Sequence, residues 1–300
     1  MPVDNYYVPD QSKWPIIGAV AVFSMVLSTA LMITGSDIAS ILFIFSSCLM
    51  AYMLFGWFQN VIEESQQGLY SDQLNRSFRL GMMWFIFSEF MFFAAFFGAL
   101  FYVRTLAIPW LDGEGAKGSS ALLWPEFSAT WPLLTNPDPE KFPSPSGIID
   151  AWKLPFINTV LLVTSSIFIT ISHHKLKAEK MAAAKIWLAL TVVFGISFIC
   201  VQIYEYIHAY NDLGLTLNAG IYGSTFFMLT GFHGAHVTIG SIMLFVMLIR
   251  MLKGHFDKVD SESLIENPDS DRLFAFEAAA WYWHFVDVIW LFLFLFVYVL

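Results

Sequence analysis

Long apolar runs separated by short polar segments dominate this chain. A run of about 20 apolar residues is long enough to cross a bilayer as a helix, and these runs lack the two-residue alternation of a membrane β-barrel. We therefore expect an all-α integral membrane protein. The seven predicted transmembrane helices span residues 14–34, 38–58, 80–102, 155–172, 182–205, 223–250 and 278–299.

The polar segments between these runs suggest how the chain is organised. Residues 59–79 are polar and separate the first two helices from the other five, so we expect an N-terminal part at 1–79 and a five-helix bundle at 80–300. The segment at about 105–154 is rich in Pro, Gly, Ser and Trp, which predicts a long irregular loop over the outer surface. The N-terminal segment has no basic region or cleavage site typical of a signal peptide, so the first helix is expected to direct insertion.

The basic residues are distributed unevenly between the two sides of the predicted membrane protein. The side with the N-terminus carries Lys13, Arg76, Arg79, Lys175, Lys177, Lys180, Lys185, Arg250, Lys253, Lys258 and Arg272. The other side carries Arg104, Lys117, Lys141 and Lys153. Because cytoplasmic loops are enriched in Lys and Arg, we expect the N-terminus inside and the C-terminus outside.

Composition narrows the class further. The chain is 57% hydrophobic and 13% charged, as expected for a membrane protein. Its net charge of -9 argues against a nucleic-acid partner, which would need a clustered excess of Lys and Arg. Cys48 and Cys200 are too far apart in sequence for a CxxC motif, and we expect both to be small buried hydrophobic residues.

Glu89 is an acidic residue in the middle of the third apolar run. On insertion scales a central acidic residue costs about 3 kcal/mol, which the surrounding Leu, Ile and Phe residues offset. Neighbouring phenylalanines share its helix face and offer no hydrogen bonds, so desolvation should favour the protonated form. Glu89 is either a neutral group in one interhelical hydrogen bond or a protonatable group linked to proton traffic, and we favour the second interpretation.

Other polar residues recur at helical spacing within the later runs. His233 and His236 are three residues apart, as are His284 and Asp287, so each pair shares a helix face. We favour a structural polar network for these residues, with a metal site at the two pairs as a less favoured alternative, and Glu205 is a further candidate member of the network. Glu205 could also be an interfacial anchor at the outer end of the fifth helix, and for this residue we favour the anchor.

Several long motifs resemble one family. They are "WFQNVIEES", "RSFRLGM", "FSEFMFFAAFF", "ISHHKL", "QIYEY", "GIYGSTFFMLTGFHGAHVTIGS" and "FEAAAWYWHFVDVIWLFLF". The chain is similar to subunit III of the haem-copper cytochrome c oxidases over nearly its whole length. The resemblance implies two helix bundles, helices 1–2 and 3–7, separated by a V-shaped cleft that binds phospholipid.

The resemblance also implies a function without redox chemistry in this chain. Subunits I and II are the expected partners, and they would hold haem a, haem a3 and copper, whereas this chain would hold no cofactor except bound phospholipid. The sequence lacks the histidine set of subunit I and the Cys-rich copper motif of subunit II. Subunit III of the family packs on subunit I, supports its proton uptake and protects the oxidase during turnover.

The family pattern assigns roles to particular residues. The carbodiimide-reactive carboxylate of the family corresponds to Glu89, and lipid contacts correspond to Trp57, Glu64, Arg79 and Arg250. The animal form has a basic residue directly before the helix-two acid, whereas this chain has a glutamate there, which weakens the expected headgroup contact.

Two alternatives remain beside an aa3-type cytochrome c oxidase subunit III. One is subunit III of a quinol oxidase, which normally lacks the first two helices. The other is a stand-alone proton-coupled transporter, although no internal repeat supports it. The long outer loop favours a bacterial inner membrane over the mitochondrial inner membrane.

Overall fold

A computed structural model describes residues 11–115, 118–257 and 268–300, with side chains left out for Asp72 and residues 268–272. Within these ranges the chain is helical and contains no strand. Seven helices are long and apolar enough to cross a membrane, and this confirms the predicted all-α fold. The candidate spans are Trp14–Ile33, Ala39–Gln66, Gln73–Leu111, Leu154–Lys177, Met181–Asp212, Gly220–Leu252 and Leu273–Val299.

Several helices extend beyond the apolar runs that predicted them. Helix α2 (Ala39–Gln66) continues through the polar segment after residue 58, where the Gln59 amide donates a hydrogen bond to Glu63 one turn later at 2.8 Å. Helix α3 (Asp72–Tyr102) begins well before Leu80. Polar residues such as Gln, Glu and Arg are good helix formers, so hydropathy alone ends α2 too early and starts α3 too late.

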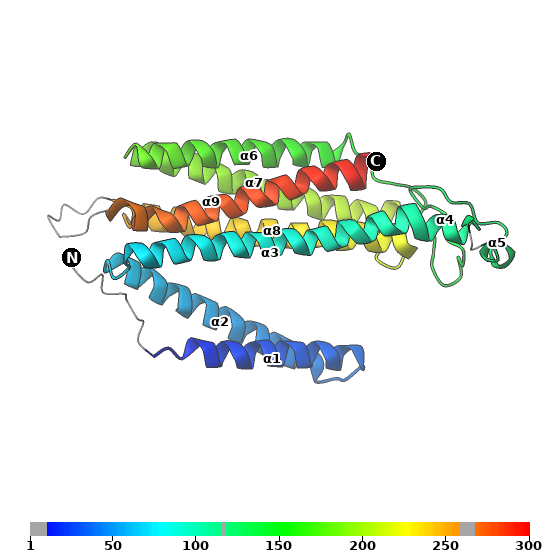
Figure 1. Ribbon diagram of the computed structural model, residues 1–300, viewed down its shortest axis with the longest axis horizontal. Coiled ribbons are helices and arrows are strands. Elements are labelled where there is room, and N and C mark those ends of the chain that lie inside the picture. The colour runs from blue at the N-terminus through cyan, green and yellow to red at the C-terminus, as the bar shows by residue number, and fades with distance from the viewer. Residues whose placement is uncertain (1–10, 116–117, 258–267) are drawn as a thin grey trace. The chain divides into compact units, whose positions relative to one another are not determined.

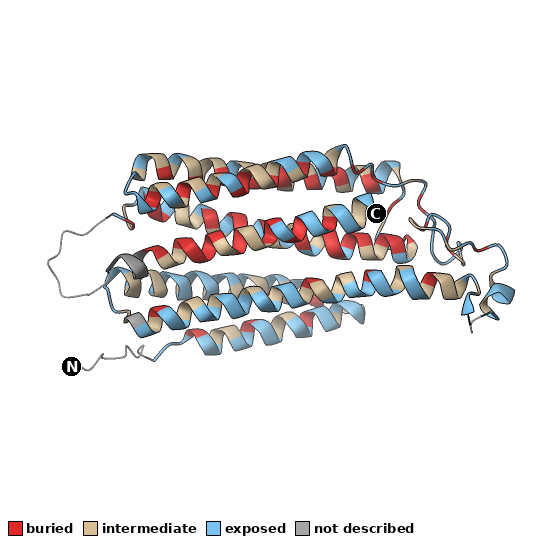
Figure 2. Ribbon diagram, turned by 45° about the horizontal axis from the view of Figure 1, so that its top comes forward, coloured by how far each residue is buried: buried red, intermediate tan, exposed pale blue. Residues whose placement is uncertain are grey.

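The first of two compact units holds α1 (Trp14–Ile33), α2, the start of α3 up to Arg79, and the first turns of α9 up to Phe274. Small residues bring α1 and α2 together, because a Cβ added at Gly56 would lie 2.0 Å from the ring of Trp14. Most side chains of both helices are exposed (Figure 2). This helix pair therefore leaves wide apolar faces for lipid or protein.

The second unit contains α3 from Leu80, α6 (Leu154–Lys177), α7 (Met181–Asp212), α8 (Gly220–Leu252) and the rest of α9 (Pro268–Leu293), which continues as the π-helix η3 (Phe294–Val299). These helices extend along one direction (Figure 1). Fully buried Trp283 of α9 lies against Gly195 and Gly240, and its indole N–H donates to Ser165 Oγ at 3.0 Å. One side chain thus joins α6, α7, α8 and α9.

The long loop after α3 has its own local structure. It contains η1 (Val103–Ala107), α4 (Ile108–Leu111) and α5 (Ser120–Leu123). The Asn136 side chain donates to the Phe142 carbonyl at 3.1 Å and lies against Gly220, where a Cβ would clash. The loop shares a buried apolar cluster with the ends of α7 and α8, formed by Ile108, Phe127, Leu133, Ile149, Ala209, Leu215, Ala219, Tyr222, Phe226 and Phe227.

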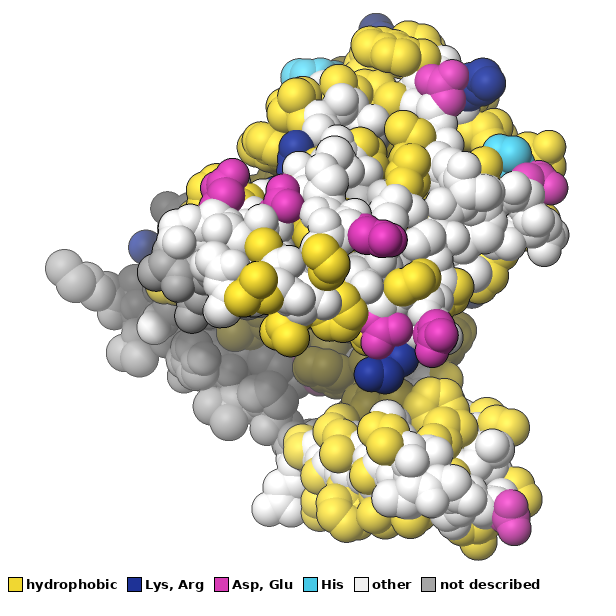
Figure 3. All heavy atoms as spheres, turned by 90° about the vertical axis from the view of Figure 1, so that its right-hand side faces the viewer, with side chains coloured by type: hydrophobic (Ala, Val, Ile, Leu, Met, Phe, Trp, Pro, Cys, Tyr) yellow, Lys and Arg dark blue, Asp and Glu magenta, His cyan; other side chains and the backbone are white. Residues whose placement is uncertain are grey.

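The end of the second unit that carries this loop shows acidic side chains dispersed among hydrophobic and uncharged ones (Figure 3). The prediction of two buried cysteines is wrong, because Cys48 and Cys200 are both exposed. Each lies on a helix face turned away from the packed side chains of its unit. Residues 258–267, which belong to the predicted inner loop before the last helix, lie outside the described residues.

Candidate functional site

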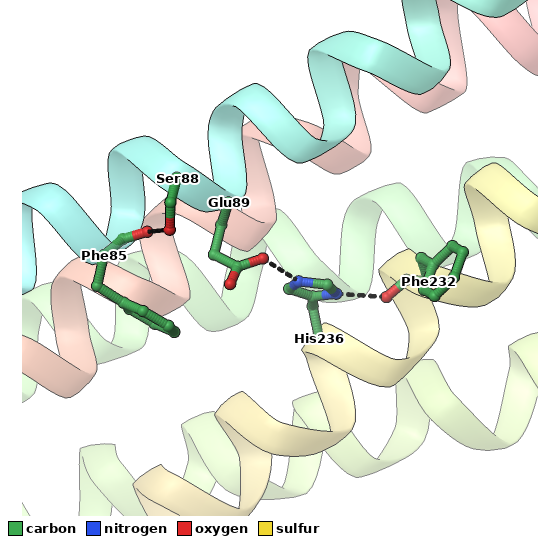
Figure 4. Close-up of polar contacts among 5 residues, drawn as sticks. All are labelled: Phe85, Ser88, Glu89, Phe232 and His236. Carbon is green, nitrogen blue, oxygen red and sulfur yellow. Dashed lines mark hydrogen bonds and ion pairs between the residues drawn. The ribbon is translucent and has the colours of Figure 1, made fainter. Parts of the chain in front are cut away.

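Glu89 of α3 pairs with His236 of α8. The Glu89 Oε2 lies 2.9 Å from His236 Nε2, and the two side chains point toward each other across the space between the helices (Figure 4). Their side chains are 24% and 12% exposed, respectively. The sequence did not suggest this partner, since the residues are far apart along the chain and the known neighbours of Glu89 were phenylalanines.

The contacts of His236 restrict where protons can be. Its Nδ1 lies 2.6 Å from the Phe232 carbonyl oxygen, which can only accept, so Nδ1 carries a proton. In a neutral imidazole, Nε2 is then an acceptor and Glu89 must donate as a carboxylic acid. In the other arrangement, an imidazolium donates to a carboxylate. Both forms are neutral overall, and they differ only in which atom holds one shared proton.

Aromatic rings pack around the His236 imidazole of this pair. The centroid of the His236 ring lies 4.9 Å from that of Phe93 in an edge-to-face contact and 6.0 Å from that of Phe92. Tyr282 of α9 lies nearly parallel to the same imidazole at 6.4 Å. These contacts hold the imidazole plane in position, so the distance between Glu89 and Nε2 is set by packing as well as by the hydrogen bond.

A second carboxyl group lies inside the bundle at Glu205 of α7. It is fully buried, and its Oε1 accepts hydrogen bonds from the Tyr298 hydroxyl at 2.6 Å and from the Gln202 amide at 3.3 Å. The Gln202 carbonyl in turn accepts from Asn158 Nδ2 at 3.3 Å. Complete burial contradicts the interfacial anchor favoured from the sequence, because the helix turns Glu205 toward the side chains of the bundle.

The remaining polar residues do not converge on one centre. His233 is buried and its Nε2 donates to the Val286 carbonyl at 3.1 Å. His284 Nδ1 lies 2.6 Å from Ser166 Oγ, and Asp287 lies beside that serine. Each histidine thus has a different partner. No group of three or more His, Cys, Asp and Glu side chains suited to a metal ion occurs within the described ranges.

The family profile described as Cytochrome c oxidase subunit III matches residues 4–112 and 131–300. The chain belongs to this family. The subunit III protein of Danio rerio is 36% identical over 288 residues, covering 95% of this chain and 93% of the relative. That of Drosophila melanogaster is also 36% identical, and that of Prototheca wickerhamii is 34% identical, each over 95% of this chain and 92% and 93% of the relative, respectively.

One further carboxylate in this subunit III chain was not predicted from the sequence to be a site residue. Glu277 of α9 is buried and lies 3.0 Å from Lys177 Nζ and 3.2 Å from His173 Nε2, both in the last turns of α6. The signal was present as a lone acid in an alanine-rich run and a basic tract at the end of another apolar run. Sequence spacing alone could not show that these two segments meet.

Three of the residues that the family pattern links to lipid lie in the first unit. Trp57 is exposed on α2 and stacks on its neighbour in sequence. The Glu64 carboxylate accepts a hydrogen bond from the Tyr70 hydroxyl at 3.0 Å. The Arg79 guanidinium lies over the Phe274 ring, 5.5 Å from its centroid.

Arg250, the fourth such residue of this subunit III chain, lies in the second unit at the end of α8. It is buried, with its guanidinium 5.0 Å from the centroid of the Phe256 ring. Burial and the positive charges of Arg250 and Lys253 lower the pKa of His255 in the following turn. At neutral pH this histidine therefore adds no further positive charge next to Arg250.

Proposed function

We propose that this chain is the non-redox third subunit of an aa3-type, proton-pumping cytochrome c oxidase, in which it stabilises the complex and supports proton uptake into subunit I. Subunits I and II are the partners and carry haem a, haem a3 and copper. Membership of the subunit III family over nearly the whole chain supports this assembly. The electron transfer and oxygen reduction belong to the partners.

The Glu89–His236 pair is the observation that supports a role in proton supply. Both residues can hold the one shared proton, and the pair is partly exposed on the flank of α3. Uptake or release of a proton at this pair changes its charge by one unit, but the shared proton can move between Glu89 and His236 with no change in net charge. A charge-neutral exchange avoids most of the cost of placing an ion in hydrocarbon.

Glu89→Gln tests this role, because it keeps the shape of the side chain but cannot exchange a proton. In the purified oxidase we expect unchanged haem spectra together with slower proton uptake, fewer protons pumped per electron, or a shorter lifetime during turnover. Ser88→Ala is a matched control, since Ser88 is the preceding residue and its hydroxyl donates within α3 to the Phe85 carbonyl at 2.7 Å. If the Glu89→Gln enzyme pumped and survived like wild type, the proton role would be wrong.

We also propose that the chain binds structural phospholipid in a V-shaped cleft between its two bundles, with Trp57, Glu64, Arg79 and Arg250 as contacts. The exposed indole suits the acyl-chain region, and the two arginines suit phosphate. Native mass spectrometry of the complex provides the test. Arg79→Ala should reduce the number of retained phospholipids, whereas Arg76→Ala on the same turn serves as a control for loss of charge alone.

The first two helices favour a cytochrome c oxidase over the alternative quinol oxidase. Both α1 and α2 are present, and the family match begins at residue 4, before them. The type of subunit II that co-purifies decides between the two enzymes, because only the cytochrome c type is expected to bind copper there. A stand-alone transporter would instead purify without haem-bearing subunits.

We propose that the chain lies in a bacterial plasma membrane, with the N-terminus in the cytoplasm and the C-terminus in the periplasm. The alternative location is the mitochondrial inner membrane. Support comes from the excess of Lys and Arg on the N-terminal side and from residues 113–130 of the outer loop, which the family profile leaves unmatched. In intact cells, a membrane-impermeant maleimide should label Lys141→Cys and spare Lys253→Cys. The reverse labelling would invert the topology.

A further inference from the structure

Four polar side chains form a hydrogen-bonded chain between α6 and α9 in the second unit, apart from the Glu89–His236 pair. The Ser166 hydroxyl lies 2.6 Å from His284 Nδ1 and is also a hydrogen-bond partner of the Asp287 carboxyl. The other imidazole nitrogen, His284 Nε2, lies 3.4 Å from Thr170 Oγ1. Ser166 and Thr170 are one turn apart on α6, and His284 and Asp287 are one turn apart on α9. The four groups are thus connected to one another across the contact of the two helices.

The acceptors in this chain decide where its hydrogens lie. The Thr170 hydroxyl donates its only proton to the Ser166 carbonyl at 2.9 Å, so its oxygen accepts from His284 and Nε2 carries a hydrogen. In a neutral imidazole, Nδ1 then accepts the Ser166 proton, and Ser166 in turn accepts from Asp287 as a carboxylic acid. Asp287 Oδ1 has no hydrogen-bond partner among the described residues, so a carboxylate there would be a poorly solvated charge. The resting arrangement therefore has the proton on Asp287.

A concerted shift of two protons converts this arrangement into an ion pair. The Asp287 O–H bond breaks as its proton moves to Ser166 Oγ, and the Ser166 O–H bond breaks as its proton moves to His284 Nδ1. The products are a carboxylate and an imidazolium, joined by a serine that has regained its hydroxyl proton. Because the net charge of the group is unchanged, the shift avoids most of the cost of an isolated ion in hydrocarbon. Ser166 thus acts as a proton relay.

A second polar group lies further along the same two helices. Buried Glu277 lies 3.2 Å from His173 Nε2 and 3.0 Å from Lys177 Nζ, and Lys177 is half exposed at the end of α6. Glu277 lies two turns before His284 on α9, and His173 lies about one turn after Thr170 on α6, so each shares a helix face with a member of the chain. The cluster and the chain therefore follow one line between the solvated end of α6 and the membrane interior.

The space beside Thr170 is accessible. Thr170 is exposed and borders a pocket of about 250 Å³. The lining residues are Val163, Ser166, Ile167, Thr170, Ile171 and Asp287. The volume and the three polar side chains among them allow the pocket to hold water. A proton can therefore pass from the cluster to His284 through water, over about 16 Å of helix length between Lys177 and Ser166.

We infer that Asp287, Ser166 and His284 form a second proton-holding site of this chain, supplied from the end of α6 through Glu277 and His173. The ligand is a proton delivered by water. The inference deepens the proposed function and rests on it for the use of this proton, which is uptake into the oxidase. The competing interpretation is a static polar contact between α6 and α9, in which His284 plays no part in the exchange of the Asp287 proton with bulk water.

Infrared spectroscopy of the resting oxidase tests the relay. Asp287→Asn identifies the C=O band of the Asp287 acid by its disappearance. This band should shift when wild type is transferred to D2O, and His284→Gln, which keeps a hydrogen bond but cannot take up a proton, should slow the shift about 100-fold. His174→Gln is a matched control, because His174 is exposed on α6 outside the chain, and it should exchange like wild type. Equal rates in wild type and His284→Gln, or no acid band in wild type, would overturn the inference.

Two further variants separate the relay from its supply. Ser166→Ala breaks the link but leaves both titratable groups in place, so the Asp287 band should move to the frequency of a free acid and exchange slowly. An unchanged band would contradict the hydrogen-bonded chain. Glu277→Gln should slow the exchange without moving the band, because it alters only the supply. Exchange at the wild-type rate in this variant would overturn the route from the end of α6.

These spectra are recorded without turnover, so they do not depend on the proton role of Glu89. If the Asp287 band behaved as expected while Glu89→Gln pumped and survived like wild type, the proposed role of Glu89 would fail and the relay would stand. If His284→Gln exchanged like wild type while Glu89→Gln impaired pumping, the relay would fail and the proposed function would stand.

Discussion

Helices α6–α9 form a packed core, whereas α3 lies at its flank with most of its surface exposed. Buried residues make up 28% to 39% of the apolar windows of α6, α7, α8 and α9 but only 11% of that of α3. Each region contains a carboxyl group inside the predicted membrane, Glu205 in the core and Glu89 on the flank. The same chemical group thus occurs once in a buried environment and once in a partly exposed one.

The hydrogen bonds of the two carboxyl groups differ in the same way. In the core, two donors converge on one oxygen of Glu205, and neither donor titrates near neutral pH. On the flank, Glu89 has one described partner, and that partner is a histidine. A fixed network suits structure, whereas a single partner that can exchange the proton suits transfer. The comparison therefore predicts large effects on stability for the core and small ones for the flank.

Glu205→Leu should give the largest loss of stability. The substitution leaves the Tyr298 hydroxyl and the Gln202 amide buried without their acceptor, at about 1–3 kcal/mol for each unsatisfied group. We expect the free energy of unfolding, measured by SDS titration of the purified protein, to fall by about 2–5 kcal/mol. Glu205→Gln retains a carbonyl acceptor and should lose much less. Equal losses in the two variants would show that the hydrogen bonds of Glu205 contribute little.

A pair of glycine substitutions compares packing in the two regions. A Cβ at Gly195 in the core would lie 2.7 Å from the Trp283 ring and 2.9 Å from Ser241 Oγ, while a Cβ at Gly98 on α3 meets nothing within 4 Å. Gly195→Ala should therefore cost about 1–3 kcal/mol of unfolding free energy through overpacking. Gly98→Ala should leave it unchanged or slightly raise it. A loss of similar size at both positions would contradict the assignment of α3 to the flank.

The sequence predicted the helices well but not the contacts between them. Hydropathy identified all seven spans, and an acid among phenylalanines marked Glu89 without any tertiary information. The partnership with His236 could not be predicted, because it depends on how two helices far apart in sequence are rotated against each other. The same unknown rotation led to the wrong interpretation of Glu205 as an anchor and of Cys48 and Cys200 as buried.

His236→Phe should give a small loss of stability and the most informative change in protonation. Phenylalanine preserves the aromatic contacts with Phe93 and Tyr282 but removes the partner of Glu89. The lost interhelical hydrogen bond should cost about 0.6 kcal/mol, well below the effect of Glu205→Leu. Phenylalanine offers the Glu89 carboxyl neither a cation nor a hydrogen bond in its apolar surroundings. Infrared spectroscopy should then show the C=O band of a free carboxylic acid that wild type lacks, with Glu89→Gln identifying the band by its disappearance. An unchanged Glu89 signal in His236→Phe would mean that the histidine does not share the proton, and the flank would differ from the core in exposure alone.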